Sequence, residues 1–287
     1  MKRRLSALSV CLVIALTAAL SLPLTASSAV SSNASSDAFA SVTIDGEVFA
    51  AGQTRIIDDT TCVPFRAFVN AMTGGEAVVW WDGDTKIAYA EYEGAVISAA
   101  IGEHYIAANG RYLWCGTETY LKDGTTYVAV RPLAAAFGAE VTWQSEGRRV
   151  IVSARGDMIE SGDTYYDATD LFWLSRIISA EAQGEPLSGK LAVGAVIYNR
   201  IASEDYPDTV YGVIFDETGG VQFTPAATGT IYSDPTEESV IAAKLCMDGY
   251  ICDERILFFC AASIAAVSWA GQNRTYLYTI EGHAFFA

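Results

Sequence analysis

The stretch of sequence from residue 169 to residue 184 reads TDLFWLSRIISAEAQG. Its aliphatic residues recur at spacings of three and four, which places their side chains on one face of a helix. The members of this apolar stripe are Leu171, Leu174, Ile177, Ile178 and Ala182. The stretch therefore predicts a helix from Thr169 to Gly184, packed on its neighbours through the stripe.

Glu181 falls within the apolar stripe, four residues after Ile177 and seven after Leu174. A carboxylate held against apolar surface has its charged form disfavoured, so its pKa rises and it keeps a proton near neutral pH, as a general acid requires. The alternative is that Glu181 only marks the helix end before Gly184, and spacing leaves both alternatives open. Glu185 is predicted to be solvated.

A second helix is predicted after Pro186, capped by Ser188 and running to Arg200. Gly194 in its middle would allow close packing on a neighbouring helix. Asn199 is a polar residue late in this apolar helix, where its amide either bonds nearby backbone or reaches a ligand.

A glycine-hinged segment, GGVQFTP, follows at residues 219–225. Gln222 and Thr224 alternate with apolar residues, which predicts a strand with both polar side chains on one face. Further on, Asp234, Pro235 and Glu237 predict the capped start of a third helix. His283, beside a glycine turn, is read from its position as a packed or capping residue.

An internal repeat occupies the earlier half of the chain. The run TCVPFR at residues 61–66 returns as TYVAVR at residues 126–131. Each copy predicts a strand, a helix that begins near Arg66 or Arg131, a glycine turn, and a strand with Trp80 or Trp143. The two arginines are read as bonding backbone groups between helix and sheet. The acidic, glycine-containing residues 156–168 are predicted to be a linker.

The N-terminus has the pattern of a secretory signal. Residues 2–4 are basic, residues 5–22 are uncharged and mainly apolar, and residues 26–29 offer small side chains for cleavage. We therefore predict a signal peptide at residues 1–29 and a Ser- and Ala-rich linker at residues 30–40. We expect no stable membrane insertion after cleavage of the signal, the alternative being an uncleaved anchor.

Composition restricts the function classes. The 287-residue chain is 51% apolar and has 34 acidic against 18 basic residues, for a formal charge of -16. This charge argues against a general nucleic-acid binder or anionic-membrane binder, because like charges repel. Only His104 and His283 could supply imidazole, and the cysteines show no C-x-x-C spacing. We predict no metal site and no cofactor.

Three groups of residues carry a first resemblance: VPFR at 63–66, ANG at 108–110, and TYVAVR at 126–131 with FGAE at 137–140. Through them residues 41–155 resemble the copper amine oxidase N-terminal-like domain, a repeated α+β module found on many exported bacterial proteins. Ala129 departs from the pattern, since the first copy has a proline there. We infer no copper, because His104 alone cannot supply the ligands.

Four ordered motifs carry a second resemblance: ISAEAQGEP at 178–186, VGAVIYNR at 193–200, QFTP at 222–225 and IEGHAF at 280–285. Together they resemble the SleB-type cell wall hydrolase family, the catalytic domain of spore cortex-lytic enzymes. The resemblance implies a mainly helical, lysozyme-like fold over residues 169–287, peptidoglycan as substrate and Glu181 as catalytic acid. Within these motifs we expect substrate-binding roles for Tyr198, Asn199, Gln222, Thr224 and His283.

One departure concerns the substrate cleft that the resemblance implies. Family members usually carry an aromatic-Asn-Pro segment where this chain has CAA at residues 260–262. Substrate preference is the property that this difference puts in question. With the resemblance in place, the alternative reading of Arg66 and Arg131 is a wall-binding surface.

The sequence thus predicts an α+β protein: a repeated, stalk-like α+β module at residues 41–155, a linker, and the helical catalytic domain. The expected activity is cleavage of the MurNAc-GlcNAc β-1,4 bond by a lytic transglycosylase in the exported compartment, at the cell wall or spore envelope, with a role in the spore cortex during sporulation or germination. One alternative is a lysozyme-type hydrolase that recruits Asp216 or Glu217 as a second carboxylate. The other is a non-catalytic wall-binding protein. Protein partners are unknown from the sequence.

Overall fold

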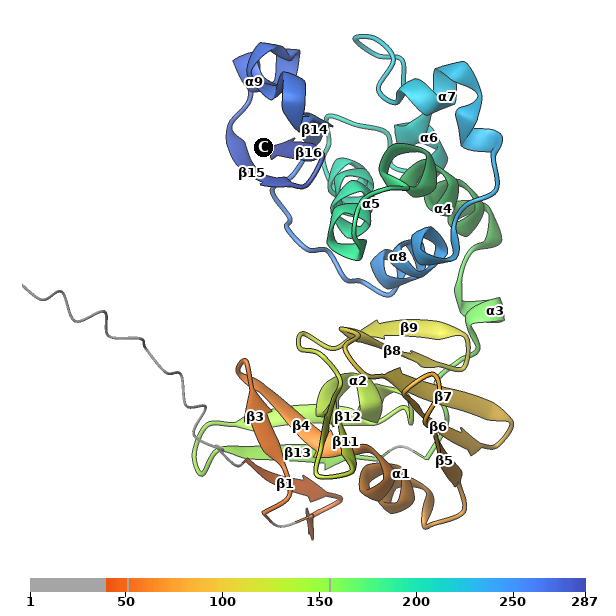
Figure 1. Ribbon diagram of the computed structural model, residues 1–287, viewed down its shortest axis with the longest axis vertical. Coiled ribbons are helices and arrows are strands. Elements are labelled where there is room, and N and C mark those ends of the chain that lie inside the picture. Colours follow the sequence, from red (N-terminus) through yellow and green to blue (C-terminus); the bar gives the residue numbers. More distant parts are fainter. Residues whose placement is uncertain (1–39, 51, 155) are drawn as a thin grey trace, which may run out of the picture. The chain divides into compact units, whose positions relative to one another are not determined.

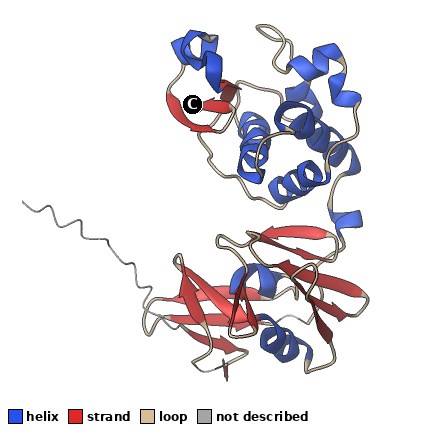
Figure 2. Ribbon diagram, in the orientation of Figure 1, coloured by secondary structure: helices blue, strands red, loops and turns tan. Residues whose placement is uncertain are grey.

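The computed structural model describes residues 40–50, 52–154 and 156–287 of the chain (Figure 1). The predicted signal peptide and residues 30–39 of the predicted linker after it lie outside the described residues. A β-rich region comes first, and a largely helical region with a small terminal sheet follows it (Figure 2). The predicted α+β fold class is confirmed. Within the described residues no helix is both long and apolar enough to span a bilayer.

The internal repeat appears as two copies of one unit, each a strand, a helix and a second strand. The predicted order of elements is confirmed in both copies. The first copy contains β4 (Thr60–Pro64), α1 (Phe65–Thr73) and β5 (Val78–Asp82), and the second contains β11 (Thr125–Ala129), α2 (Val130–Ala135) and β12 (Glu140–Gln144).

The two copies pair with each other through equivalent strands. β4 and β11 run antiparallel with Val63 opposite Val128, and these two valines occupy the same position in their copies. The neighbouring pairs, Pro64 with Tyr127 and Cys62 with Ala129, exchange when the copies are exchanged. The pairing therefore has an internal two-fold symmetry centred on the Val63–Val128 pair. β3 (Arg55–Ile57) and β10 (Tyr120–Lys122) complete this sheet in the order β10-β11-β4-β3.

Two further sheets each contain the last strand of one copy, β12 or β5. One has the order β12-β13-β1-β2, in which β1 (Ser41–Ile44) runs parallel to β13 (Arg149–Ser153) and antiparallel to β2 (Glu47–Phe49). The other is an antiparallel meander that starts at β5. Its remaining strands are β6 (Ile87–Tyr92), β7 (Ala95–Ala100), β8 (Tyr105–Ala108) and β9 (Arg111–Trp114).

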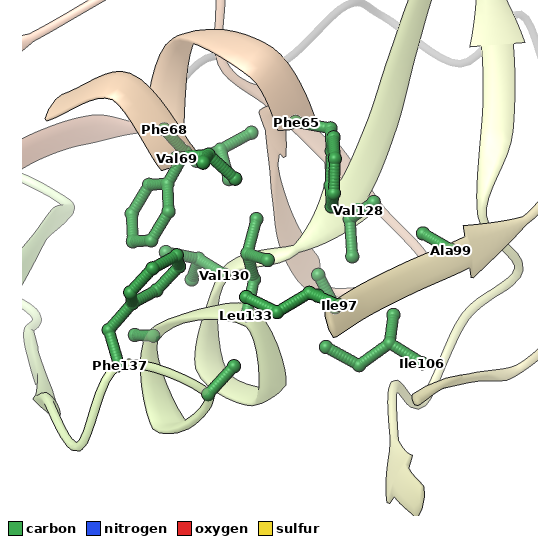
Figure 3. Packing of buried hydrophobic residues seen from close by; sticks show 14 of the residues in the cluster. Phe65, Phe68, Val69, Ile97, Ala99, Ile106, Val128, Val130, Leu133 and Phe137 are labelled. Carbon is green, nitrogen blue, oxygen red and sulfur yellow. The ribbon is translucent and has the colours of Figure 1, made fainter. Parts of the chain in front are cut away.

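The core of the β-rich region lies between these sheets and the two helices (Figure 3). Phe65, Phe68 and Val69 of α1 follow the spacing of one helix face and are buried, and Leu133 of α2 meets them. Each fully buried side chain of this size stabilises the fold by about 1.5 to 3 kcal/mol relative to an exposed one. The apolar pattern of the repeat thus accounts for how the helices attach to the sheets.

Arg66 and Arg131 make the structural contacts that were predicted from the repeat. Arg66 Nη1 donates a hydrogen bond of 2.7 Å to the carbonyl oxygen of Val79, and Arg131 Nη1 donates one of 2.8 Å to that of Val141. Each bond joins the start of a helix to the tryptophan-bearing strand of the same copy.

Residues 156–168, predicted to be a linker, are tied to the β-rich region. The amide of Ile159 donates to the carbonyl oxygen of Ala136 (3.0 Å), and the Asn109 side chain donates to that of Ile159 (2.8 Å). A single helical turn, α3 (Gly162–Tyr165), follows, and its Gly162 amide donates to the Asn109 carbonyl. The segment is therefore an anchored connection, while its exact boundaries stay predictions.

The helical region is built on three helices that pack on one another: α4 (Ala168–Ala182), α5 (Leu187–Ile201) and α8 (Glu237–Met247). Shorter elements surround these three helices. They are the helices α6 (Val210–Ile214), α7 (Thr224–Thr228) and α9 (Trp269–Asn273) and the 3-10 turns η1 (Thr230–Tyr232) and η2 (Ala262–Val267). A small sheet of order β14-β16-β15 consists of β14 (Phe258–Ala261), β15 (Tyr276–Ile280) and β16 (His283–Phe286).

Two predicted helix caps are wrong. Thr236, not Asp234, caps α8, because its hydroxyl accepts a hydrogen bond from the Ser239 amide. Asp234 instead forms an ion pair of 3.0 Å with Arg176. Pro186 occupies the cap position of α5 without a side-chain bond, so Ser188 does not cap that helix.

The predicted close packing at Gly194 is confirmed. A Cβ atom at this position would lie 2.6 Å from Cys246 Sγ on α8 and 3.2 Å from Ile178 Cδ1 on α4. Only a glycine lets the three helices approach this closely.

Candidate active site

Glu181 lies one residue before the end of α4. The helix is capped at its start by Asp167, whose carboxylate accepts hydrogen bonds from the amides of Thr169 (2.8 Å) and Asp170 (2.9 Å). One turn before Glu181, Ile177 and Ile178 are fully buried. The predicted helix is thus confirmed to within two residues, and Glu181 is both close to its end and on its apolar side.

The Glu181 carboxyl group is half-buried, and burial raises its pKa to about 7. No charged group contributes to this shift. Among the described residues, no side chain forms a hydrogen bond or an ion pair with the carboxyl group. Burial at the negative end of a helix dipole accounts for the preference for the neutral form.

Glu185 is not solvated as predicted. Its side chain is only 13% exposed, and its Oε1 lies 3.6 Å from Nδ1 of His283, which is equally shielded. Its Oε2 accepts a hydrogen bond of 3.3 Å from the Gly282 amide. Glu185 therefore connects the start of α5 to the turn between β15 and β16.

Two glycines make room for Glu185. A Cβ atom on Gly189 would lie 2.8 Å from the Glu185 Cβ, and one on Gly282 would lie 2.5 Å from Glu185 Oε1. The sequence reasoning missed this contact. The spacing of a glycine four residues after Glu185, together with the glycine before His283, is the signal that could have found it.

His283 lies at the start of β16, and its ring packs edge-on against Phe259 at 5.3 Å. Burial lowers its pKa, and the nearby Glu185 carboxylate partly opposes that effect. The position agrees with the reading of a packed residue, while its role in substrate binding stays a prediction.

Tyr198 and Asn199 lie in the last turn of α5 and have different neighbours. The Asn199 amide nitrogen donates to the carbonyl oxygens of Asp253 and Ile256, both at 2.8 Å, so its donors hold the loop before β14. Tyr198 is half-buried and packs on the core of α4, α5 and α8, and burial raises its pKa. For Asn199, the contacts match the backbone-bonding alternative.

The strand predicted around Gln222 and Thr224 is wrong. Gln222 lies in a loop, where it donates to the carbonyl oxygens of Thr218 and Gly220 and accepts from Arg200. Thr224 begins α7, which has a proline in its first turn. The two side chains do not share a strand face.

Asp216 and Glu217, the candidate second carboxylates, lie in the loop after α6 and line a small pocket of about 40 Å³ with Gln222. Hydrogen bonds from Thr218 lower the pKa of Asp216, so this carboxylate stays ionised. In the part of the chain that the structure describes, no three His, Cys, Asp or Glu side chains group as metal ligands do.

Two family matches cover most of the described chain. Residues 43–152 match the copper amine oxidase N-terminal domain, and residues 184–286 match the cell wall hydrolase family. The second match begins three residues after Glu181, so the case for Glu181 rests on its own geometry and on the motif around it.

Curated relatives match through one part of the chain. A spore cortex-lytic enzyme of Bacillus cereus is 34% identical over 104 residues, which are 36% of this chain and 39% of that protein. The Bacillus subtilis enzyme of the same name is also 34% identical over 104 residues, 33% of its length. That of Halalkalibacterium halodurans is 39% identical over 84 residues, which are 29% of this chain and 24% of that protein. The chain therefore spans well under half the length of these relatives.

Among solved structures, the catalytic domain of the germination-specific lytic transglycosylase SleB from Bacillus anthracis is 31% identical, with a TM-score of 0.38. The match covers 45% of this chain and 100% of the chain in that structure. The sequence matches identify a copper amine oxidase N-terminal domain followed by a SleB-like cell wall hydrolase domain homologous to that of spore cortex-lytic enzymes.

Proposed function

We propose that this chain is an exported peptidoglycan glycosidase that cleaves the β-1,4 bond between N-acetylmuramic acid and N-acetylglucosamine as a lytic transglycosylase. Glu181 is its acid and base. The homology of the second domain to spore cortex-lytic enzymes supports the substrate class. From this substrate class we infer that the protein acts in the spore cortex or the cell wall.

One observation carries the mechanism: burial alone raises the pKa of Glu181 to about 7. A glycosidase that forms a covalent intermediate has a second carboxylate about 5 to 5.5 Å from the acid. An ionised carboxylate that close would itself raise the pKa of Glu181 by charge repulsion, and no such contribution is present. This argues against a covalent intermediate. The route that we propose needs no second carboxylate.

In that route the neutral Glu181 carboxyl donates its proton to the glycosidic oxygen as the bond from that oxygen to C1 of the muramic acid breaks. The resulting carboxylate then accepts the proton of the muramic acid 6-hydroxyl, whose oxygen bonds to C1. The product is a 1,6-anhydro ring, no water is consumed, and Glu181 ends in its starting protonation state.

The test is the chemistry of the new ends after digestion of purified sacculi, read by mass spectrometry and borohydride reduction. We expect 1,6-anhydromuramic ends that resist borohydride. Reducing muramic ends alone would instead establish the hydrolase, with ionised Asp216 as the first candidate for its second carboxylate.

A sacculus turbidity assay separates both reactions from a non-catalytic binding protein. Turbidity should fall with time if the domain is an enzyme. Binding of the chain to sacculi without any fall in turbidity would leave the protein a wall binder.

A further inference from the structure

The β-rich region has two grooves that the internal symmetry relates to each other. One has a volume of about 590 Å³ and the other of about 520 Å³. The first includes Arg66 and Trp81, and the second includes Arg131 and Trp143, which occupy the same places in the other copy. Each arginine bonds the carbonyl oxygen two residues before its tryptophan, and the tryptophan that takes the place of Trp143 is thus Trp81 and not Trp80.

The equivalence extends to the opposite wall of each groove. Thr125 and Thr126 of the second copy line the first groove, and their equivalents in the first copy, Thr60 and Thr61, line the second. Each groove is therefore made by the helix start and tryptophan strand of one copy and by the central sheet strand of the other. The shared lining of two separate grooves points to a single kind of ligand for both.

Both grooves present accessible indole rings. Trp81 is 40% exposed and Trp143 41%. Each lies opposite a buried residue of the next strand, Ala88 or Val150, so both indoles are on the groove side of their strands. Trp80 is on the other face of β5, where it stacks on Tyr89 at 5.1 Å. Exposed aromatic faces such as those of Trp81 and Trp143 mark recognition surfaces for ligands with flat apolar faces.

Polar donors lie beside the indoles. Arg66 and Arg131 each use one N–H group on a backbone carbonyl, and both side chains are exposed with further donors of the five that a guanidinium carries. The lining of each groove has a net charge of +1, in a chain whose formal charge is -16. Locally positive grooves on an acidic protein suit a ligand that is rich in hydroxyl groups and carries occasional carboxylates.

We propose that the two grooves are equivalent subsites for a peptidoglycan glycan strand, with the pyranose rings stacked on Trp81 and Trp143. The proposal rests on the proposed function, which makes this polymer the substrate of the same chain. A glycan strand fits the observations because it repeats, as the grooves do. It also combines apolar ring faces with hydroxyl and acid groups.

The direct test uses the full chain carrying Glu181→Gln, labelled with 5-fluorotryptophan at its six tryptophans. Each fluorine resonance is assigned by a Trp→Phe variant, and glycan strands freed of stem peptides are then added. We expect the resonances of Trp81 and Trp143 to shift. That of Trp80, which is 38% exposed on the opposite face of the same strand as Trp81, should stay in place and serves as the matched control.

Three results would overturn the proposal: unmoved groove resonances, a shift of Trp80 equal to theirs, or shifts produced by free stem peptides and not by glycan. The last result would assign the grooves to a peptide ligand.

A second measurement is co-sedimentation of the Glu181→Gln chain with intact sacculi. Trp81→Ala or Trp143→Ala should each weaken binding about 2- to 10-fold, the usual contribution of one aromatic contact. Trp80→Ala should bind as the parent does, and circular dichroism confirms that each variant is folded. Equal binding by all three variants would also overturn the proposal.

The proposed function is tested separately, by Glu181-dependent cleavage of sacculi. Cleavage together with unmoved groove resonances removes only the subsites. Shifted groove resonances without cleavage support the subsites and remove the enzymatic function.

Discussion

The Glu181 carboxyl group meets two conditions that disfavour its charge. It is half-buried beside fully buried isoleucines, and it lies at the end of α4 where the backbone carbonyls carry partial negative charge. Both conditions act in the same direction, and they hold a proton on the group near neutral pH. A side chain in this state can give up its proton to a leaving group at the pH of the cell wall.

The first prediction is that Glu181→Gln lowers the rate of sacculus digestion by about 10²- to 10⁴-fold, because a neutral amide cannot transfer the proton. Binding to sacculi should be retained. The measurement is turbidity loss and soluble product release at matched folding.

Glu204→Gln is the matched control, because Glu204 is exposed in the loop after α5 and makes no hydrogen bond or ion pair among the described residues. It should digest sacculi at the parent rate. An active Glu181→Gln chain would exclude Glu181 as the acid.

The second prediction concerns the pH dependence of the rate. Only the protonated carboxyl can act as the acid, so activity should fall about tenfold per pH unit above the pKa of about 7. A rate profile between pH 5 and pH 9 on purified sacculi checks this. A rate that stays constant to pH 9 would contradict the assigned pKa.

The third prediction concerns stability. The pKa of Glu181 is raised from 4.5 to about 7 in the folded chain, so the folded state binds the proton more tightly than the unfolded state. The contribution of this group is fully present below pH 4.5 and is lost as the pH rises to 7. Glu181→Gln should therefore be more stable than the parent by about 1 to 3 kcal/mol at pH 8 and by little at pH 4. Chemical denaturation at both values measures it.

At this scale the sequence predicted the surroundings of Glu181 and missed those of Glu185. Ile177 and Ile178, four and three positions before Glu181 on its own helix, are fully buried, and periodicity describes the buried side that they define. Glu185 meets Gly282 and His283, 97 and 98 residues further along, and no local pattern reports such a contact.

At the scale of elements, the repeat was the most informative feature. A strand, helix and strand recurring with the same arginine predicted both copies and both bonds from arginine to backbone. The strand predicted at Gln222 failed because the alternation was only a few residues long. Pro225, in the first turn of α7, was the stronger signal, and it favours a helix start.

The fourth prediction tests the packing of α5 on α4 and α8. Gly194→Ala would place a methyl group 2.6 Å from Cys246 Sγ, so the helices must separate and the chain should lose about 1 to 3 kcal/mol of stability. Adding Cys246→Ala removes the sulfur and should recover part of the loss. Denaturant titration of the two single variants and the double variant gives the coupling, and a purely additive result would contradict the contact.

At the scale of the whole molecule, the fifth prediction is activity without a metal ion. The chain has two histidines, and its described residues contain no group of ligands suited to a cation. Digestion of sacculi should proceed at an unchanged rate in the presence of a chelator. Loss of activity that one specific metal restores would contradict it.

The two-fold pairing of β4 with β11 has a consequence for how this module could arise and be divided. The β4–β11 contact has the form of the isologous interface of a homodimer, with Val63 and Val128 on its axis and both halves carried on one polypeptide. Neither copy contains a whole groove, since each groove is lined by residues of both copies. One copy produced alone would expose the edge of its central strand, and it could recover a complete groove only by associating with a second copy of itself.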